Sequence, residues 1–568
     1  MTGMRKGLTS YGDPGFSLFL RKAFIKAMGL SDDALTRPIV GIADTASDYN
    51  ACHGNAAQLV EAIKRGVLLA GGLPMAFPTI SLHESFAHPT SMFLRNLMAM
   101  DTEEMIRAQP MDAVVLVGGC DKTIPAQLMA AASADLPAIV VPVGPMLVGH
   151  HQGEQLGACT DCRRLWGEFR GGRIDEREIE AISGRLAPTA GTCMVMGTAS
   201  TMACLTEAMG LALPLSASIP ATHADRLRLA EASGTRAVAM AQAQGPRPSA
   251  LITAASLRNA SVVMQAIGGS TNGLIHLTAI AGRLGLAVDL AEFDRLGRDV
   301  PVLVDLKPSG AHYMEHFHWA GGVPRLLREL GDLIDLDTPT VSGATLREVA
   351  ESAEIVAGQD VIRARSAPVK PMGSMAVLHG NLAPRGAVIK QSAASTSLMV
   401  HRGRAVVFES VQDLAERIDD PALDVHADDV LVLRNAGPLG APGMPEAGYL
   451  PIPRKLAVQG VKDMVRLSDA RMSGTAFGTI VLHIAPEAAA GGPLGLVRDG
   501  DLISLDVPAR RIEVLVEEQE LARRAAEPRP PGAAPSPERG YAALFHRSVL
   551  QADEGCDFDF LVPGRLRG

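Results

Sequence analysis

The sequence GGCDK at positions 118–122 places a thiol, a carboxylate and an amine side by side, which is the strongest local candidate for chemistry in the chain. The apolar run before it predicts a strand, and the residues after it predict a helix. A helix N-terminus and the cation of Lys122 would both favour the thiolate form of Cys120, the form that binds metals and attacks electrophiles. The same residues are equally typical of a structural turn with an incidental ion pair, and both interpretations stay open on local grounds.

The chain has seven cysteines, at positions 52, 120, 159, 162, 193, 204 and 556. The number is odd and too small for a disulfide scaffold, so in a reducing compartment we expect buried apolar residues, metal ligands or nucleophiles. Cys52 lies between a predicted strand and a predicted helix, and Cys193 precedes a helix rich in small residues. Both positions resemble that of Cys120.

Cys159 and Cys162 form a C-x-x-C pair. A structural zinc site needs a second pair at similar spacing, and the sequence has none. A redox dithiol usually begins a helix after a strand, whereas we expect this pair in a glycine-rich loop. We therefore assign it no function.

Two further motifs are short. His312, Glu315 and His316 fit the H-x-x-E-H pattern of some zinc proteases, but no third ligand lies nearby, and we favour polar packing between domains. The GGSTN sequence at 268–272 could open a helix and bind an anion. Walker A, G-x-S-x-G and strand-associated G-x-G-x-x-G motifs are missing from the sequence, which disfavours kinases, serine hydrolases and nucleotide-dependent dehydrogenases.

Alternating elements should position the first group of cysteines. We predict strands at 37–44, 111–119 and 136–144, and helices at 54–72 and 120–135. This alternation predicts a parallel sheet covered by helices, in which ligands bind at the carboxyl ends of the strands. Cys52 and Cys120 fall at such ends.

From about residue 373 the pattern changes to short β-rich runs separated by turn residues, which predicts a barrel or sandwich with a few helices. We place the boundary near 366–373, which gives an α/β domain over 1–368 and a β-barrel-like domain over 369–568. The proline-rich segment 528–540 predicts an extended surface excursion.

Composition agrees with a globular enzyme: 568 residues, 47% hydrophobic and 20% charged, with a net charge of −9. No block of lysine or arginine suggests nucleic acid or a membrane surface as partner. The longest apolar stretch, 136–149, is too short and too interrupted to span a bilayer, and the first residues lack the pattern of a signal peptide. We expect a cytoplasmic protein.

Longer motifs recur in order in one known family. They are YNACHGN (49–55), TISLHES (79–85), LRNLMAM (94–100), GGCDKTIPA (118–126), GTCMVMGTASTM (191–202), GGSTN (268–272), GNLAPRGAVIK (380–390), RNAGPLGAPGMPEAG (434–448), SDARMSGTAFGT (468–479) and GCDFDFL (555–561). From about residue 10 to 561 the chain resembles the dihydroxy-acid/6-phosphogluconate dehydratase family, on its sugar-acid branch.

The resemblance implies an N-terminal α/β domain, a C-terminal β-barrel, and assembly into homodimers or homotetramers. It implies a [2Fe–2S] cluster on three cysteines, with the other cysteines dispensable; the three are Cys52, Cys120 and Cys193. It also implies a Mg²⁺ site with a carbamylated lysine, made by Glu84, Asp121, Lys122 and Glu446. The catalytic serine of the family falls on Ser473, with Thr475 as a neighbour.

The implied reaction removes water from a 2,3-dihydroxy acid and gives a 2-keto-3-deoxy acid. Mg²⁺ would stabilise the enediolate-like charge, and an iron left open by three-cysteine ligation would act as Lewis acid on the 3-hydroxyl. Ser473, whose pKa nearby positive charge would lower, would remove the C2 proton. Competing interpretations are a zinc hydrolase built on the histidine motif and a non-catalytic protein that binds metabolites.

The substrate expected is a straight-chain aldonate such as arabinonate or xylonate. Branched-chain dihydroxy-acid dehydratases, the alternative, tend to have Asp where this chain has Glu84. His83 stands where relatives have a small residue, either as a hydrogen-bonding group for substrate or as a partner of Glu84, and Ala447 stands where many sugar-acid members have Trp. Because no cluster of lysine or arginine lies near the motifs, 6-phosphogluconate is less favoured.

Overall fold

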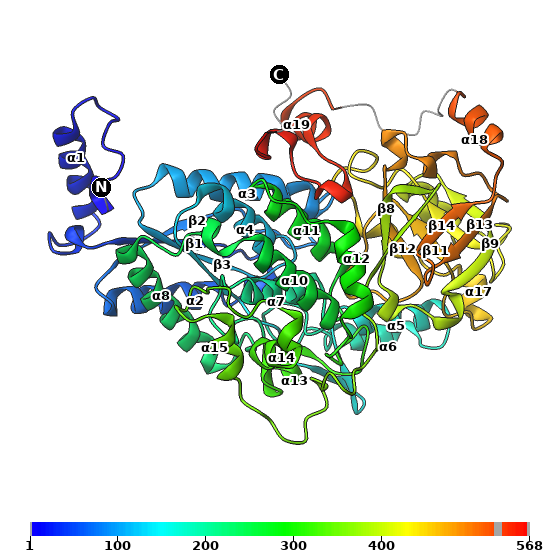
Figure 1. The fold of residues 1–568 in the computed structure, drawn as a ribbon, viewed down its shortest axis with the longest axis horizontal. Coiled ribbons are helices and arrows are strands. Elements are labelled where there is room, and N and C mark those ends of the chain that lie inside the picture. The colour runs from blue at the N-terminus through cyan, green and yellow to red at the C-terminus, as the bar shows by residue number, and fades with distance from the viewer. Residues whose placement is uncertain (1–2, 528–536, 565–568) are drawn as a thin grey trace.

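The computed structural model describes residues 3–527 and 537–564 (Figure 1). Its N-terminal half contains a four-stranded parallel sheet in the order β2-β1-β3-β4. The strands are β1 (Ile39–Asp44), β2 (Leu73–Pro78), β3 (Ala113–Gly118) and β4 (Ala138–Pro142). The predicted α/β domain with a parallel sheet is therefore confirmed.

Helices cover both faces of this sheet. In Figure 1, α2 (Ala56–Leu69) and α8 (Ala224–Ala243) pack together on one side, and α3 (Ser91–Ala108) and α4 (Thr123–Ala134) on the other. Because both faces are covered, β3 is buried along its whole length and reads as an unbroken apolar run.

A second group of buried helices lies beneath α4. It consists of α7 (Thr198–Ala208), α10 (Ala254–Ala266) and α11 (Thr271–Gly282). The GGSTN motif opens a helix as expected, because Ser270 caps α11 by accepting a hydrogen bond from the Asn272 N–H.

The C-terminal half is a closed eight-stranded barrel in the order β10-β11-β12-β8-β7-β14-β13-β9. Its strands are β7 (Ala376–Gly380), β8 (Ala383–Ile389), β9 (Val400–Phe408), β10 (Val430–Leu433), β11 (Arg466–Ser468), β12 (Ile480–Ala485), β13 (Leu502–Asp506) and β14 (Arg511–Val514). The strands follow the predicted pattern of short β-rich segments after residue 373, and the predicted barrel is confirmed. The sequence pattern missed β11, which is only three residues long.

Between the two halves, Ile362 and Lys370 pair with Val304 and Val302, so the chain up to residue 370 stays attached to the N-terminal half. The C-terminal segment also returns to that half. Helix α19 (Gly540–Ser548) packs near α3 and α11, as Figure 1 shows in red. Most of the proline-rich segment, 528–536, lies outside the described residues. No helix in the described ranges is long and apolar enough to cross a membrane.

Candidate active site

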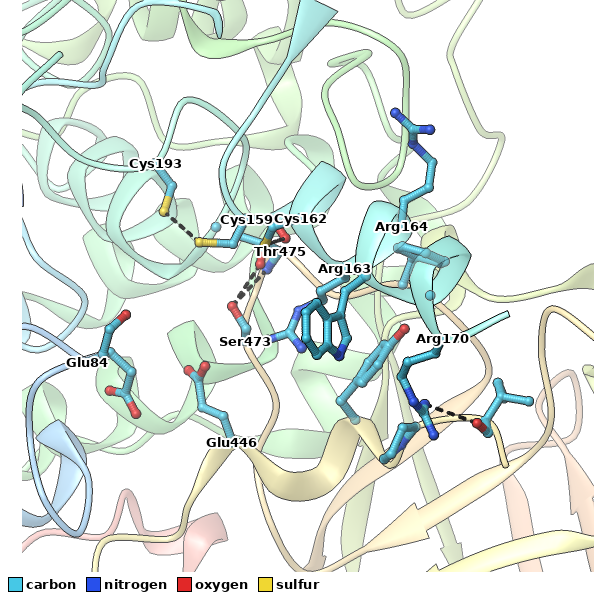
Figure 2. Close-up of a pocket in the computed structure, with 18 of the residues that line it drawn as sticks. Glu84, Cys159, Cys162, Arg163, Arg164, Arg170, Cys193, Glu446, Ser473 and Thr475 are labelled. Carbon is cyan, nitrogen blue, oxygen red and sulfur yellow. Dashed lines mark hydrogen bonds between the residues drawn. The ribbon is translucent and has the colours of Figure 1, made fainter. Parts of the chain in front are cut away.

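A cavity of about 930 Å³ lies where loops of the two halves meet (Figure 2). Loops that follow β1, β2 and β3 contribute Cys52, Glu84 and Cys120, and the barrel contributes Glu446 and Ser473. Neighbouring parallel strands end at the same edge of a sheet, which is why residues far apart in sequence meet here.

The cysteines named by the family motifs line this cavity. Cys52 lies in a 3-10 turn (Ala51–His53), Cys120 follows β3, and Cys193 precedes α7. The sulfur atoms of Cys52 and Cys120 and a ring nitrogen of His83 all lie within 4.8 Å of one another. All seven cysteines are free thiols.

The expectation of a glycine-rich loop around Cys159 and Cys162 is wrong. Cys159 is the N-cap of α5 (Thr160–Arg170), which follows the short strand β6 (Glu154–Leu156), and Cys162 lies in the first turn of the helix. The glycines that suggested a loop flank the helix, and Gly171 ends it. The Cys159 Sγ lies 3.4 Å from the Cys193 Sγ, so this pair belongs to the same cavity.

His53, which the sequence analysis did not single out, holds the loop of Cys120. Its Nε2 accepts hydrogen bonds from the N–H groups of Gly119 and Cys120, each at 3.0 Å. Its Nδ1 therefore carries the proton and donates to the Thr45 carbonyl at 3.0 Å. Burial lowers the pKa of His53 to about 4, so the ring stays neutral and keeps this bonding pattern.

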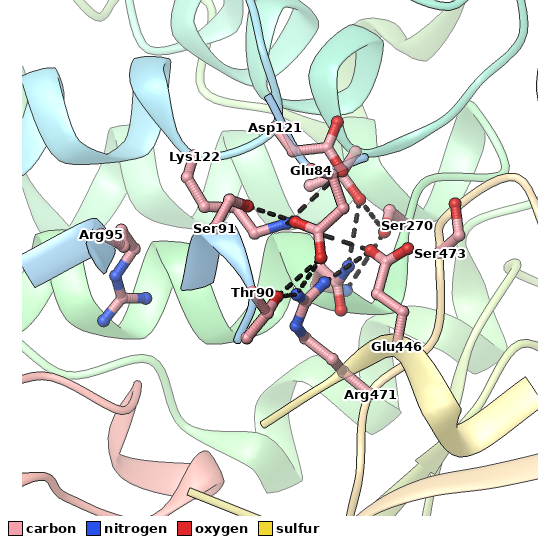
Figure 3. Close-up of polar contacts among 12 residues, drawn as sticks. Glu84, Thr90, Ser91, Arg95, Asp121, Lys122, Ser270, Glu446, Arg471 and Ser473 are labelled. Atoms are coloured by element: carbon pink, nitrogen blue, oxygen red, sulfur yellow. Dashed lines mark hydrogen bonds and ion pairs between the residues drawn. The ribbon is translucent and has the colours of Figure 1, made fainter. Parts of the chain in front are cut away.

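Three carboxylates surround the ammonium of Lys122 (Figure 3). Its Nζ lies 3.0 Å from Glu84, 3.5 Å from Asp121 and 3.9 Å from Glu446. Arg471 binds Glu446 at 2.5 Å and Glu84 at 2.9 Å, and was also missed by the sequence analysis. Lys122 and Arg471 are each 1% exposed.

This arrangement sets the protonation of the carboxylates. Burial acts to raise the pKa of Glu84, but Arg471 and Lys122 outweigh it and hold the pKa well below its usual range. Burial raises the pKa of Glu446, against the effect of Arg471. Burial and Arg471 act to lower the pKa of Lys122, but the three carboxylates outweigh them and raise it. The group is therefore a compact ionic cluster in which the two cations are buried and the three carboxylates face the cavity.

Ser473 and Thr475 lie on the barrel side of the cavity. Their hydroxyl groups are 2.8 Å apart, and Ser473 is 8% exposed. The backbone around them is fixed by Asn272, which donates to the Met472 carbonyl at 3.0 Å, and by Lys390, which donates to Gly474 at 3.2 Å. GGSTN is therefore buried beneath the serine loop, and its helix N-terminus supports that loop.

The zinc interpretation of His312, Glu315 and His316 is wrong. The helix there, α13 (Met314–Trp319), begins after His312, so the two histidines do not sit one turn apart on a helix. Glu315 accepts a hydrogen bond from the Val148 N–H instead. Among residues 3–527 and 537–564, the single group of three His, Cys, Asp or Glu ligand atoms within 4.8 Å of one another is Cys52, His83 and Cys120.

His83 lines the cavity beside these thiols, and its Nδ1 accepts a hydrogen bond from the Ser85 N–H at 3.2 Å. A neutral ring in this state carries its proton on Nε2 and is a hydrogen-bond donor. Ala447 packs against the apolar cluster around Leu450.

The expectation that no cationic cluster lies near the motifs is also wrong. Helix α5 crosses the cavity and brings Arg163, Arg164 and Arg170 to its wall. Arg164 is paired with Glu154 and Arg170 with Asp419. Arg163 stacks on the ring of Tyr449 at 4.8 Å and has no ion pair within the described residues. These arginines lie outside the recurring motifs, between those at 118–126 and 191–202, so the motifs alone did not indicate them.

Comparison with known proteins finds one family. The models of the dihydroxy-acid/6-phosphogluconate dehydratase N-terminal and C-terminal domains match residues 37–349 and 360–556. An L-arabonate dehydratase from Azospirillum brasilense is 49% identical, over 96% of this chain and 95% of the relative. A 6-deoxy-6-sulfo-D-gluconate dehydratase from Pseudomonas putida is 44% identical over 96% and 94%. A dihydroxy-acid dehydratase from Acetivibrio thermocellus is 37% identical over 94% and 96%.

Proposed function

The chain belongs to the dihydroxy-acid/6-phosphogluconate dehydratase family and is a dehydratase, and from this premise we propose that it converts a sugar acid with hydroxyl groups at C2 and C3 into a 2-keto-3-deoxy acid. The higher identity to dehydratases of sugar acids than to those of branched-chain dihydroxy acids supports this substrate class. The observation that carries the proposal is that one cavity contains free thiols, carboxylates and Ser473.

Cys52, Cys120 and Cys193 are suited to hold a [2Fe–2S] cluster. They are free thiols on three different loops, and they face one cavity. Sulfur donors are the ligands that iron–sulfur clusters require. When bound, the cluster would supply a Lewis acid for the 3-hydroxyl. His53 would hold the Cys120 loop for it through the two N–H groups described above.

Glu84, Asp121 and Glu446 are suited to hold Mg²⁺, because oxygen donors are the ligands that this ion prefers. In the structure the Lys122 ammonium occupies the space between them. The ammonium must first lose a proton, and reaction of the neutral amine with carbon dioxide then gives a carbamate and releases a second proton, so the charge on the lysine falls from +1 to −1. Mg²⁺ restores those two charges, so the buried cluster keeps its net charge. The ion would stabilise negative charge on the substrate carboxylate and 2-hydroxyl.

Ser473 is the base in this proposal. Its hydroxyl faces the cavity, and Thr475 lies within hydrogen-bond distance to orient it. Gly474 lies between them and packs against Ser270. A Cβ atom at position 474 would come within 2.5 Å of the Ser270 side chain, so the loop can approach Ser270 this closely only with glycine at this position. A deprotonated Ser473 would take the proton from C2 of the substrate.

The test is to purify the protein without air and to measure its content of iron, sulfide and magnesium. The formation of 2-keto acid is then measured with each member of a substrate panel. The panel contains L-arabinonate, D-xylonate, D-galactonate, D-gluconate, 6-phosphogluconate, 6-deoxy-6-sulfogluconate and 2,3-dihydroxyisovalerate. We expect a sugar acid to give the highest kcat/KM. The highest value with 2,3-dihydroxyisovalerate would contradict the substrate class and leave the dehydration chemistry in place. We also propose a homodimer or homotetramer, which light scattering will test.

A further inference from the structure

Of the five cysteines that line the cavity, four have sulfur atoms arranged as two pairs. Cys52 and Cys120 form one pair, with sulfur atoms within 4.8 Å of each other. Cys159 and Cys193 form the other, at 3.4 Å. Figure 2 shows the side chains of Cys159 and Cys193 pointing toward each other across the cavity wall. Cys159 comes from α5 and has no part in the proposed three-cysteine site.

The spacing of the second pair suits joint binding of one metal atom. Two thiolates held by a tetrahedral metal ion at bond lengths of about 2.3 Å lie roughly 3.8 Å apart. The observed 3.4 Å is close to this separation. Two pairs of sulfur atoms are also the number and grouping that a [2Fe–2S] cluster with four cysteine ligands needs.

We infer that Cys159 is a fourth, exchangeable cysteine ligand of the cluster site, bound beside Cys193 in the absence of substrate and displaced by the substrate hydroxyl. The inference rests on the proposed function, because the dehydration described above needs one ligand position to be open. The exchange breaks one iron–sulfur bond and forms one iron–oxygen bond. It leaves the oxidation state of iron unchanged, and the released thiolate takes one proton from solvent.

The surroundings of Cys159 allow the side chain to move while the backbone stays in place. Thr160 donates to the Thr475 carbonyl at 2.9 Å, and Asp161 accepts from the Gly157 N–H at 2.8 Å and from Lys307 at 2.9 Å. These contacts fix the first turn of α5. A rotation about the Cα–Cβ bond of Cys159 therefore suffices to withdraw its sulfur atom from the site.

This role gives the resting enzyme a closed ligand set. With all four thiolates in place, no iron position faces water or dioxygen, and the position opens only when a sugar acid fills the cavity. Cys162 cannot take the same role in this conformation, because its thiol donates to the Cys159 carbonyl at 2.6 Å. It lines the same cavity and so provides a matched control.

The experiment compares the wild-type protein with Cys159→Ser, Cys159→Ala and Cys162→Ser, all purified without air. Visible absorption and the paramagnetic resonance of the reduced cluster are recorded with and without saturating L-arabinonate, in a Ser473→Ala background chosen to slow turnover. We expect the sugar acid to shift the wild-type spectrum. The Cys159 variants should retain iron, show a different spectrum before ligand is added, and bleach several-fold faster in air. Cys162→Ser should behave as the wild type.

Three results would overturn the inference: wild-type spectra and bleaching rates in both Cys159 variants, the same changes in Cys162→Ser, or loss of iron from both Cys159 variants, which would make Cys159 an obligatory ligand. Circular dichroism of each variant separates loss of iron from loss of folding. Wild-type protein without iron or sulfide would instead contradict the proposed function, so the two failures are distinguishable.

Discussion

At the scale of single residues, the position of Ser473 is fixed by its neighbours. Lys390 holds the adjacent backbone at Gly474, and Thr475 forms a hydrogen bond with the Ser473 hydroxyl. If Ser473 is the base, as proposed, Ser473→Ala removes only the proton acceptor. We expect kcat to fall by about 10²–10⁴, the usual contribution of a general base. The visible spectrum and iron content should stay as in the wild type. A variant whose turnover remains within about tenfold of the parent would exclude the role.

In the proposed site, Lys122 binds Mg²⁺ only after carbon dioxide has converted its amine into a carbamate. We expect a chelator to abolish activity and Mg²⁺ to restore it. Protein equilibrated with ¹³C-labelled carbon dioxide should give one carbamate resonance that Lys122→Arg lacks, because a guanidinium cannot form the carbamate. Lys122→Arg should also lose activity while keeping the cluster spectrum. Full activity in this variant would contradict the carbamate.

Arg163 is a cation of the cavity wall that has no ion pair with a carboxylate of the described residues. A guanidinium in this setting binds sulfonate or phosphate through charge-assisted hydrogen bonds. We expect Arg163→Ala to raise KM for 6-phosphogluconate or 6-deoxy-6-sulfogluconate more than for D-gluconate. Arg164→Ala is the control, because Arg164 is already paired with Glu154. Equal changes in KM for all three acids would show that Arg163 does not bind the group at C6 of the substrate.

The residues of the site divide into those that motifs could indicate and those that they could not. The thiols and carboxylates were indicated because they stand in long recurring motifs. His53 and Arg471 lie in the same motifs, but they act through hydrogen bonds and ion pairs that no spacing rule reveals. Cys159 and Arg163 depend on where α5 folds, which is a tertiary property.

At the scale of elements, the turn between β3 and α4 is held by one imidazole. His53→Ala would leave two buried N–H groups, those of Gly119 and Cys120, without an acceptor. Each such group costs about 1–3 kcal/mol. We expect a lower free energy of unfolding in urea and lower iron content after purification without air. His426→Ala, on an exposed surface, should change neither. Full iron content in His53→Ala would show that the turn holds its shape unaided.

The elements themselves were predictable where burial gives a strong pattern. Strands β1, β3 and β4 are covered on both faces and read as apolar runs, and the barrel strands are separated by turn residues. Strand β11 has too few residues to give a pattern, and its place in the barrel comes from pairing with β10 and β12. Helix α5 was missed because its flanking glycines dominated the local composition.

At the scale of the whole molecule, the site exists only while the two halves keep their relative positions. Arg471 of the barrel half binds Glu84 of the α/β half directly. The C-terminal segment adds a second connection, because Arg95 donates to the carbonyl groups of Gly555 and Cys556 at 2.8 and 2.9 Å. The described C-terminal segment, residues 537–564, is therefore part of the scaffold of the site, although none of these residues lines the cavity.

The buried pair of Arg283 and Asp557 provides the test of this connection. The two side chains are 0% exposed and lie 2.6 Å apart. Asp557→Ala leaves the Arg283 cation buried with only Glu103, at 3.3 Å, as a nearby carboxylate. Removing one partner of a buried pair costs about 3–5 kcal/mol, so we expect a clear fall in the thermal midpoint and loss of activity at lower temperature than in the wild type.

Asp332→Ala breaks an arginine pair on the surface and should leave the midpoint unchanged, because water already solvates both charges. Equal midpoints for the two variants would show that the C-terminal segment does not hold the halves together.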